Sequence, residues 1–483
     1  MTGSQGPNRA ELIAGSFWKG GSAAIRTVLS IATQVVLGFL LVSEDFGIYA
    51  LAIGVANLVQ VFRDGGVRLI TTRMRPDKIS DLHGRLTRYS LAASLAVAPI
   101  VLAAGLVASR FYGEPDVFRL VLILAVAIPL GFYAPLGFGV LHAELQFRRA
   151  ATIEVVSAGL RQMAIVVLAL LGFGPFSFVL PVVGVNLFES VATRWVVGRR
   201  GSPEPTGRLF EAVSVGQFAW ATAGGWLGTI SQSVPYLVLG GLVSVSTLGY
   251  VFFAYQIVTR LMFVIGSARN VAMPAFAQRG LTAENLGQAV VIAAALGGFI
   301  TVGLALTGPD ILTVIWGSKW APSIGALVAF AFMLPFNTSS EMAEHATVAV
   351  GRFGLWSGQL AVRIVGLAAG ATIGGLTLPE DPTLAAIWIT AGAVVSSLAV
   401  MWWTNHEFDT GSPKQRWAVG VLSPLVLLGT AVLLTLKAAL SAIGWSGLAV
   451  GVLLTIALVA SILRVSPQVR QTMRGLNPKR VFV

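Results

Sequence analysis

Long apolar runs are the feature of this 483-residue sequence that most limits its fold. Many of them extend over roughly 18 to 25 residues, the length that an α-helix needs to cross a hydrocarbon core of about 30 Å. Charged residues make up only 11% of the chain, and its mean hydropathy is +0.80. A soluble domain needs a polar stretch of about 100 residues, and the sequence has none of that length. The sequence therefore predicts an all-α polytopic membrane protein.

The apolar runs predict fourteen transmembrane helices, and the first is expected to be retained because its apolar segment is too long for a cleaved signal peptide. The expected helices cover residues 17–41, 46–62, 89–109, 117–140, 155–173, 176–197, 214–239, 246–268, 287–307, 322–347, 356–377, 383–403, 417–436 and 445–463.

A repeated pattern divides these helices into two related halves. Phe46–Tyr49 leads into the second helix, and Leu248–Ala254 repeats the pattern in the eighth. The linker-like segment Arg199–Pro205 falls between the sixth and seventh helices. We expect two pseudo-symmetric six-helix lobes with the same orientation, followed by two further helices and a basic tail. The expected domains are residues 1–200, 201–405 and 406–483.

The positive charge of the chain predicts its orientation. The net charge is +12, and most Lys and Arg residues fall in the loops on one side, which is expected to be cytoplasmic with both termini. The opposite loops are expected to hold only three basic residues, Arg110, Lys319 and Lys437, together with acids such as Asp310. Basicity of this kind reflects topology and attraction to anionic lipids, so we expect membrane lipids and no nucleic acid as partners.

Four arginines fall within apolar spans, where a charge costs at least about 2.5 to 3.5 kcal/mol unless it is paired or hydrated. They are Arg26, Arg161, Arg260 and Arg363. Each is expected about 9 to 15 Å from the cytoplasmic end of its helix, with two in each lobe. One hypothesis is a cationic cavity between the lobes, where guanidinium groups bind the phosphates of a substrate. The alternative is that each arginine reaches the interface or pairs with an acid.

Intramembrane acids offer a second set of candidate residues, namely Glu189, Glu341 and Glu344, with His345 beside them. Glu341 and Glu344 are three residues apart, so they share one helix face. Such a cluster could bind protons or sodium ions during transport, or could neutralise the arginines. These two roles are compatible. The chain has no cysteine, so thiolate metal sites and disulfides are excluded, and we expect no cofactor and no metal.

Several motifs together resemble the polysaccharide transporter family of the multidrug, oligosaccharidyl-lipid and polysaccharide exporter superfamily, the Wzx-like flippases. The resemblance runs from about residue 12 to about residue 370. The motifs are Phe46–Tyr49 with the exit Asp64–Gly66, Leu248–Tyr255, Met273–Phe276 and Ile315–Trp320. At Pro235 the chain departs from the family, because many relatives carry an aspartate at the matching place.

The resemblance implies a twelve-helix, two-lobe core with two further helices. It also implies the flipping of an undecaprenyl-diphosphate-linked oligosaccharide across the bacterial inner membrane, without an enzymatic step. Glycosyltransferases and a polysaccharide polymerase would then be partners. Three alternatives stay open: a lipid II flippase, a multidrug or small-molecule antiporter of the same superfamily, and a membrane polysaccharide polymerase. The last is disfavoured because the expected outside loops are short and contain no histidine.

Overall fold

The computed structural model describes residues 9–60, 67–68, 71, 76–198, 215–279, 282–408, 423–442, 447 and 449–456. Every regular element in these ranges is a helix, which confirms the all-α class. The chain divides into two compact units, Met1–Ser233 and Val234–Val483, hereafter unit 1 and unit 2. This boundary falls inside one helix. The lobe boundary expected at residue 200 lies in a segment outside the described residues and stays a prediction.

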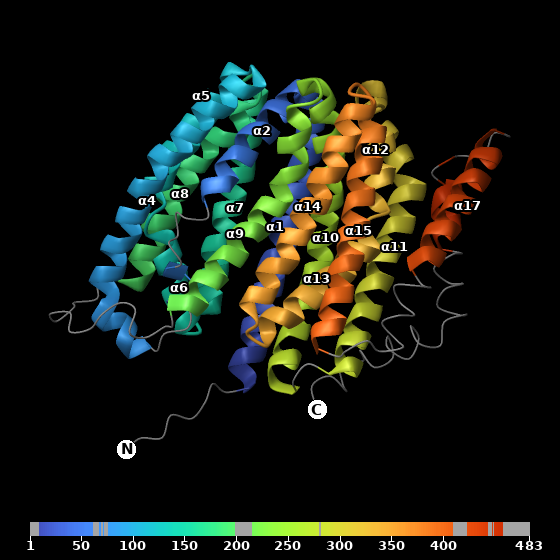
Figure 1. Cartoon of the computed structure of the whole chain (residues 1–483). Coiled ribbons are helices and arrows are strands. Elements are labelled where there is room, and N and C mark those ends of the chain that lie inside the picture. Colours follow the sequence, from blue (N-terminus) through green and yellow to red (C-terminus); the bar gives the residue numbers. More distant parts are fainter. Residues whose placement is uncertain are drawn as a thin grey trace. The chain divides into compact units, whose positions relative to one another are not determined.

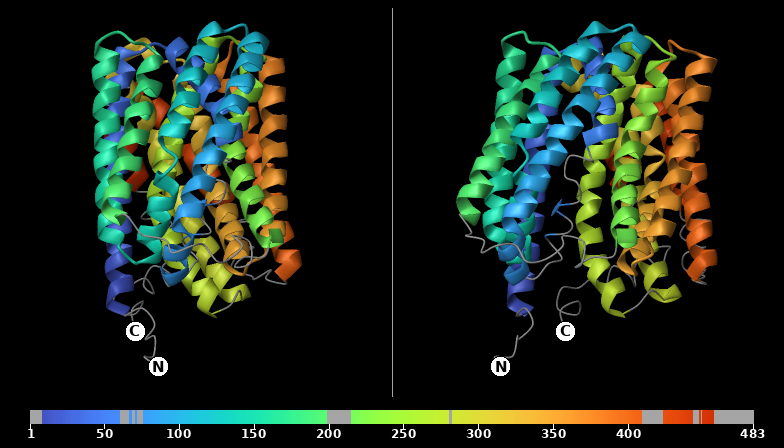
Figure 2. Two further views of the ribbon diagram at one scale, coloured as in Figure 1. Left: turned by 90° about the vertical axis from the view of Figure 1, so that its left-hand side faces the viewer. Right: turned by 60° about the vertical axis from the view of Figure 1, so that its left-hand side comes forward.

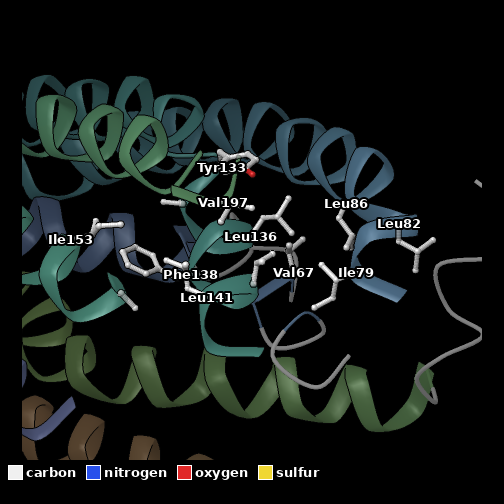
Figure 3. Packing of buried hydrophobic residues seen from close by; sticks show 13 residues of the cluster. Val67, Ile79, Leu82, Leu86, Tyr133, Leu136, Phe138, Leu141, Ile153 and Val197 are labelled. Atoms are coloured by element: carbon white, nitrogen blue, oxygen red, sulfur yellow. The ribbon is translucent and has the colours of Figure 1, made fainter. Parts of the chain in front are cut away.

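Unit 1 is a bundle of helices in which α1 packs on α7, α4 on α5, and α8 on both α5 and α7 (Figures 1 and 2). Its elements are α1 (Arg9–Leu40), α2 (Ser43–Gln60), α4 (Pro76–Tyr112), α5 (Pro115–Leu130), α6 (Ala134–Ala143), α7 (Phe147–Leu170), α8 (Phe176–Val197) and the first part of α9 (Val215–Gly240). Figure 3 shows a core cluster around α6, where Leu136 and Leu141 lie near Val67 and the α4 residues Ile79 and Leu86.

Unit 2 begins with the end of α9. It continues with α10 (Val245–Arg279), α11 (Ala283–Trp316), the 3₁₀-helix η2 (Gly317–Trp320), α12 (Ser323–Ala331), α13 (Leu334–Ala349), α14 (Phe353–Thr377), α15 (Pro382–Phe408) and α17 (Ser423–Ala442). Residues 449–456 are also helical. The helices α14 and α15 pack closely along their length, and α13 contacts both of them as well as α11 (Figure 1). Gly366 and Gly392 let the α14 and α15 backbones touch, because a methyl group at either position would clash with the other helix.

Two expected helices are each broken into a bent pair. Residues 117–140 form α5 and α6, and residues 322–347 form α12 and α13; each pair is bent by 48°. Pro135 and Pro335 stand in the first turns of α6 and α13, where a missing backbone N–H costs nothing. The same break therefore occurs at the corresponding place in each unit, which supports the internal duplication.

The described residues contain seven helices that are long and apolar enough to cross a membrane, or nine if each bent pair is one span. A polytopic membrane protein is therefore confirmed, whereas the count of fourteen stays a prediction. Several helices are longer than expected: α4 begins at Pro76 rather than at residue 89, and α7 begins at Phe147 rather than at residue 155. The Asp64–Gly66 exit, the Arg199–Pro205 linker and the basic tail lie outside the described residues.

The sequence of the segment Pro309–Ser323, with two tryptophans and a lysine, predicts a position at the outer membrane interface, and the structure buries part of this segment against other helices. The helix α11 continues to Trp316, and Trp320 is fully buried. The Trp320 ring stacks on Phe253, with 3.8 Å between the ring centroids. This aromatic contact holds Trp320 within the protein core, and the position of the segment at the outer membrane interface stays a prediction.

The C-terminal helices contact α11 at a single turn of that helix, which contains Leu306 and Asp310. The Lys437 ammonium on α17 forms an ion pair with Asp310 and donates to the carbonyl oxygen of Leu306. A methyl group on Gly451 would lie 2.6 Å from the same carbonyl oxygen, so the last described helix contacts this turn too. The sequence pattern placed Lys437 and Asp310 in outside loops. That expectation was wrong, because both lie within helices and satisfy each other's charge.

Replacing Lys437 with Met is expected to destabilise the protein by about 3 kcal/mol, because it leaves the Asp310 carboxylate unpaired in a largely buried position. The double variant K437M/D310N is expected to regain most of this loss. Thermal unfolding in detergent, followed by circular dichroism, measures both. Equal destabilisation by the single and double variants would show that the ion pair does not hold α17.

Candidate functional site

Unit 2 contains a buried charge cluster made by α13 and α14, hereafter the unit 2 charge cluster, which consists of Arg363, Glu341 and Glu344. The Arg363 Nη2 atom lies 2.8 Å from Oε1 of Glu344, and Nη1 lies 3.8 Å from Oε1 of Glu341. The Arg363 side chain is only 11% exposed and that of Glu344 only 7%. The structure thus brings together one predicted arginine and two predicted acids.

Polar groups of three helices extend this cluster. Arg363 also donates from Nη2 to the Ser340 hydroxyl at 2.7 Å. Ser340 lies 3.2 Å from the Ser397 hydroxyl of α15, which donates to the Asn337 amide oxygen at 2.9 Å. The spacing of Asn337, Ser340, Glu341 and Glu344 on α13 places them on one face of the helix, so they reach α14 and α15 together.

The charges of this cluster would allow Arg363 to change its contacts when one of the acids is neutralised. Two carboxylates lie near one guanidinium, so Arg363 has a second acid to contact if either acid is neutralised. Buried pairs of this kind are held by their mutual attraction, and neutralising one acid weakens the hold on the arginine. The cluster can therefore exchange a cation for the arginine contact.

The other predicted residues of unit 2 lie on α10 and α13, and the predicted acid of unit 1 lies on α8. Arg260 lies half-buried on α10, and His345 lies half-buried on α13 next to Glu344. Glu189 lies half-buried on α8 of unit 1, where its backbone carbonyl accepts a hydrogen bond from Thr193. The roles expected for these three residues stay predictions.

Unit 1 holds a second group of charges, hereafter the unit 1 charge cluster, in which Arg26 of α1 and Arg68 share the carboxylate of Glu154 on α7. Nη1 of Arg26 lies 3.4 Å from Oε2, and Nη2 of Arg68 lies 3.8 Å from Oε1. The guanidinium carbon of Arg68 also lies 5.5 Å from the centre of the Phe138 ring. The Glu154 carboxylate thus lies near two guanidinium groups.

Arg161 extends this positive charge along α7. It follows Glu154 by seven residues, so both side chains emerge from the same face of the helix. Its Nε atom is buried without a hydrogen-bond partner, and the described residues provide no acid for its guanidinium. Gln34 of α1, which is 3% exposed, likewise has a buried Nε2 without an acceptor. The neighbouring helices α1 and α7 therefore each present a buried donor that lacks an acceptor.

Sequence reasoning missed Glu154 because the expected helix began one residue after it, whereas α7 begins at Phe147. The seven-residue spacing of Glu154 and Arg161 is the signal that could have found it. Arg161 therefore lies fourteen residues after the start of α7, rather than six residues after the start of the expected helix. Among the described residues, no group of three or more His, Asp or Glu side chains could hold a metal ion.

Residues 36–325, more than half of the chain, match the model of a family described as "Polysaccharide biosynthesis protein". A curated relative is the succinoglycan biosynthesis transport protein ExoT of Rhizobium meliloti (strain 1021), which is 24% identical over 318 residues. That match spans 62% of this chain and 62% of the relative.

Solved structures of related folds cover almost the whole chain. A lipid II flippase MurJ in an inward closed conformation has a TM-score of 0.66 at 14% identity, with 94% of this chain and 99% of that chain covered. An inward-facing multidrug resistance MATE family transporter of the MOP superfamily has a TM-score of 0.57 at 16% identity, with 80% and 94% covered. At these identities the likeness shows the fold. The family resemblance found in the motifs is confirmed: the chain belongs to the polysaccharide biosynthesis protein family and has the fold of MOP superfamily transporters.

Proposed function

We propose that this protein is a flippase that moves an undecaprenyl-diphosphate-linked oligosaccharide across the bacterial inner membrane for polysaccharide biosynthesis. The family match and the succinoglycan transport relative support a substrate of this class. The protein changes the location of its substrate and makes or breaks no covalent bond. Alternating access, coupled to protons or sodium ions, would supply the direction.

The observation that carries this proposal is the buried Nε atom of Arg161, for which the described residues provide no hydrogen-bond partner. A guanidinium within an apolar helix is costly when, as for Arg161, the described residues provide no acid for it, and an anionic ligand would remove this cost. The diphosphate of a lipid-linked sugar offers acceptors for bidentate hydrogen bonds from arginine. Arg161 would bind it directly, and Arg26 would exchange its contact with Glu154 for a phosphate oxygen.

The two charge clusters suggest different tasks for the two units. The unit 1 charge cluster has more guanidinium groups than acids, which suits the anionic substrate. The unit 2 charge cluster has more acids than guanidinium groups, which suits a coupling cation. Arg363 therefore acts as a counter-ion of Glu341 and Glu344 in this proposal rather than as a phosphate ligand. Arg260 remains a candidate ligand of the substrate.

The same diphosphate chemistry would serve a lipid II flippase, so the headgroup decides between these two functions. A cationic drug would not suit the positive unit 1 charge cluster, which disfavours a multidrug antiporter. In the proposed setting both termini face the cytoplasm. Glycosyltransferases would supply the substrate on that side, and a polysaccharide polymerase would consume it on the other.

The test is translocation in proteoliposomes that contain the purified protein. Fluorescently labelled lipid-linked oligosaccharide, isolated from the cells that make this protein, is added with labelled lipid II as the comparison. We expect the oligosaccharide to move to the opposite leaflet, where a membrane-impermeant quencher no longer reaches it, and lipid II to stay accessible. Preferential movement of lipid II would replace the proposed function with the alternative. Movement of neither lipid by the folded, reconstituted protein would refute both.

A further inference from the structure

Polar side chains lie in successive layers between α13, α14 and α15 of unit 2, hereafter the polar column. It starts at the end of the bundle where α13 and α15 stop and α14 begins. In order, its layers are Arg352 with Glu407; Thr347, Gln359 and Thr404; Glu344 with Arg363; and Asn337, Ser340, Glu341 and Ser397. Successive members of each helix are mostly three, four or seven residues apart, so they lie on one face. The column joins an exposed end to the buried charge cluster.

Exposure falls steeply along the polar column. At its outer end, Nη2 of Arg352 lies 2.7 Å from Oε1 of Glu407, and their side chains are 54% and 38% exposed. In the next layer, Gln359 is fully buried. Its Nε2 atom donates to the Thr404 hydroxyl at 2.8 Å and to the Thr347 hydroxyl at 3.2 Å.

Gln359 has a polar atom without a partner. The Thr347 and Thr404 hydroxyls donate to the carbonyls of Ala343 and Val400 in their own helices, so the Gln359 amide must donate to both threonines. Its Oε1 atom then has no donor. Turning the amide over would leave Nε2 without an acceptor instead, so one buried atom lacks a partner in either orientation. Leaving such a group unsatisfied costs about 1 to 3 kcal/mol, and a buried water is the usual remedy.

We propose that Gln359 holds a water molecule that relays protons to Glu344, and that the coupling cation of unit 2 is a proton. Gln359 precedes Arg363 by one helical turn, and Thr347 follows Glu344 by one turn, so the two layers are adjacent. A proton entering past Arg352 and Glu407 would bind the water, and the water would pass a proton to the Glu344 carboxylate and become neutral again. Glu344 then loses its charge and releases Arg363, which keeps its contacts with Ser340 and Glu341.

The arginine itself disfavours sodium. A sodium ion between Glu341 and Glu344 would lie within about 4 Å of the Arg363 guanidinium, and this repulsion costs roughly 4 kcal/mol in a protein environment. A proton instead binds to the carboxylate and removes the charge that holds the arginine. Proton uptake and arginine release are thus the same step.

The charged and titratable groups around Glu344 come from several helices. Glu341 and His345 flank it on α13, and Arg363 faces it from α14. From α10, Tyr255 is close enough to interact electrostatically with Arg363 and Glu341, and Arg260 lies further along the same helix. The helix α15 carries no charged residue from Pro382 to Asn405, and α11 carries Glu284 and Asp310 near its two ends. Within the described helices, Glu344 is therefore the acid closest to both Arg363 and the Gln359 layer.

This proposal rests on the proposed transport function for its biological role, but its chemistry is measured without substrate. Infrared difference spectra of the reconstituted protein record the C=O stretch of protonated carboxyl groups after a pH jump. We expect a band that E344Q removes. Q359M is expected to slow the rise of that band at least tenfold, and T404V is expected to slow it while T404S does not. The control T372V alters an α14 hydroxyl that, within the described residues, donates to the Ala368 carbonyl of its own helix, and it should leave the rate unchanged.

Three outcomes would overturn the relay: a band that persists in E344Q, a wild-type rate in both Q359M and T404V, or equal slowing by T372V. Replacing potassium with sodium is expected to leave the pH midpoint of the band unchanged, and loss of the band in sodium would assign the cluster to that ion. Translocation without this band would overturn the relay and leave the proposed function standing. Detection of the band without translocation would refute the proposed function and leave the relay standing.

Discussion

Replacing Arg161 with methionine is expected to lower translocation of the lipid-linked oligosaccharide roughly 10- to 100-fold, because hydrogen bonds to a charged partner contribute about 1.5 to 3 kcal/mol. The folded protein should lose no stability, because Arg161 has no acid partner in the described structure. Its stability is expected to rise by up to about 2.5 kcal/mol, the cost of placing an arginine at the centre of a span. Loss of transport with retained or increased stability is therefore the result expected of a substrate ligand.

The matched control for this prediction is R149M, the same substitution on the same helix. Arg149 is exposed near the start of α7 and donates to Gln146 at 2.9 Å. It should change neither transport nor stability by a measurable amount. R161K is expected to keep part of the activity, because lysine retains the charge but cannot form the bidentate contact. Undiminished transport by R161M would remove Arg161 from the site, and a clear loss of stability would give it a structural role instead.

Replacing Arg363 with methionine is expected to destabilise the protein, in contrast to R161M. Removing the guanidinium deprives Glu341 and Glu344 of their ion pairs with Arg363, and breaking a buried pair in this way costs about 3 to 5 kcal/mol. The double variant R363M/E344Q should regain most of this stability, because Glu344 is the more buried of the two acids. Neither variant is expected to couple transport to a cation. Thermal unfolding in detergent and translocation in proteoliposomes measure the two effects separately.

An exposed ion pair next to the same helix is the control for Arg363. Nη2 of Arg352 lies 2.7 Å from Oε1 of Glu407, but both side chains are partly exposed. R352M is therefore expected to lower the free energy of unfolding by less than about 1 kcal/mol. Equal losses for R352M and R363M would mean that burial does not set the strength of the unit 2 charge cluster. A stable R363M that still transports would remove the cluster from the coupling step.

The helices were the part of the fold that the sequence predicted well. The expected span 176–197 coincides with α8, and the starts or ends of α9, α14 and α15 differ from expectation by a few residues. In lipid each backbone N–H and C=O must be satisfied within its own segment, so a hydrophobic run specifies a helix without reference to the rest of the chain. The extension of α4 to Pro76 was missed because polar and basic residues there interrupt the apolar pattern.

The candidate site was predicted only in part. The sequence indicated Arg161 and Arg363 as costly charges within spans, and it placed Glu341 and Glu344 on one helix face. It could not show that Arg363 contacts both acids while the described residues provide no acid for Arg161. It also gave no reason to single out Gln359, whose importance comes from the threonines of two other helices.

By itself, the sequence determined the all-α membrane class, the internal duplication and the residues that are costly to bury, because these follow from hydropathy and helical periodicity within single segments. The tertiary structure alone decided which charges are neutralised: Lys437 by Asp310, Arg363 by two acids, and Arg26 by an acid shared with Arg68. The physical reason is that a charge is stabilised by whatever lies within a few ångströms of it. Those neighbours come from helices far apart in the chain, whose packing no local pattern specifies.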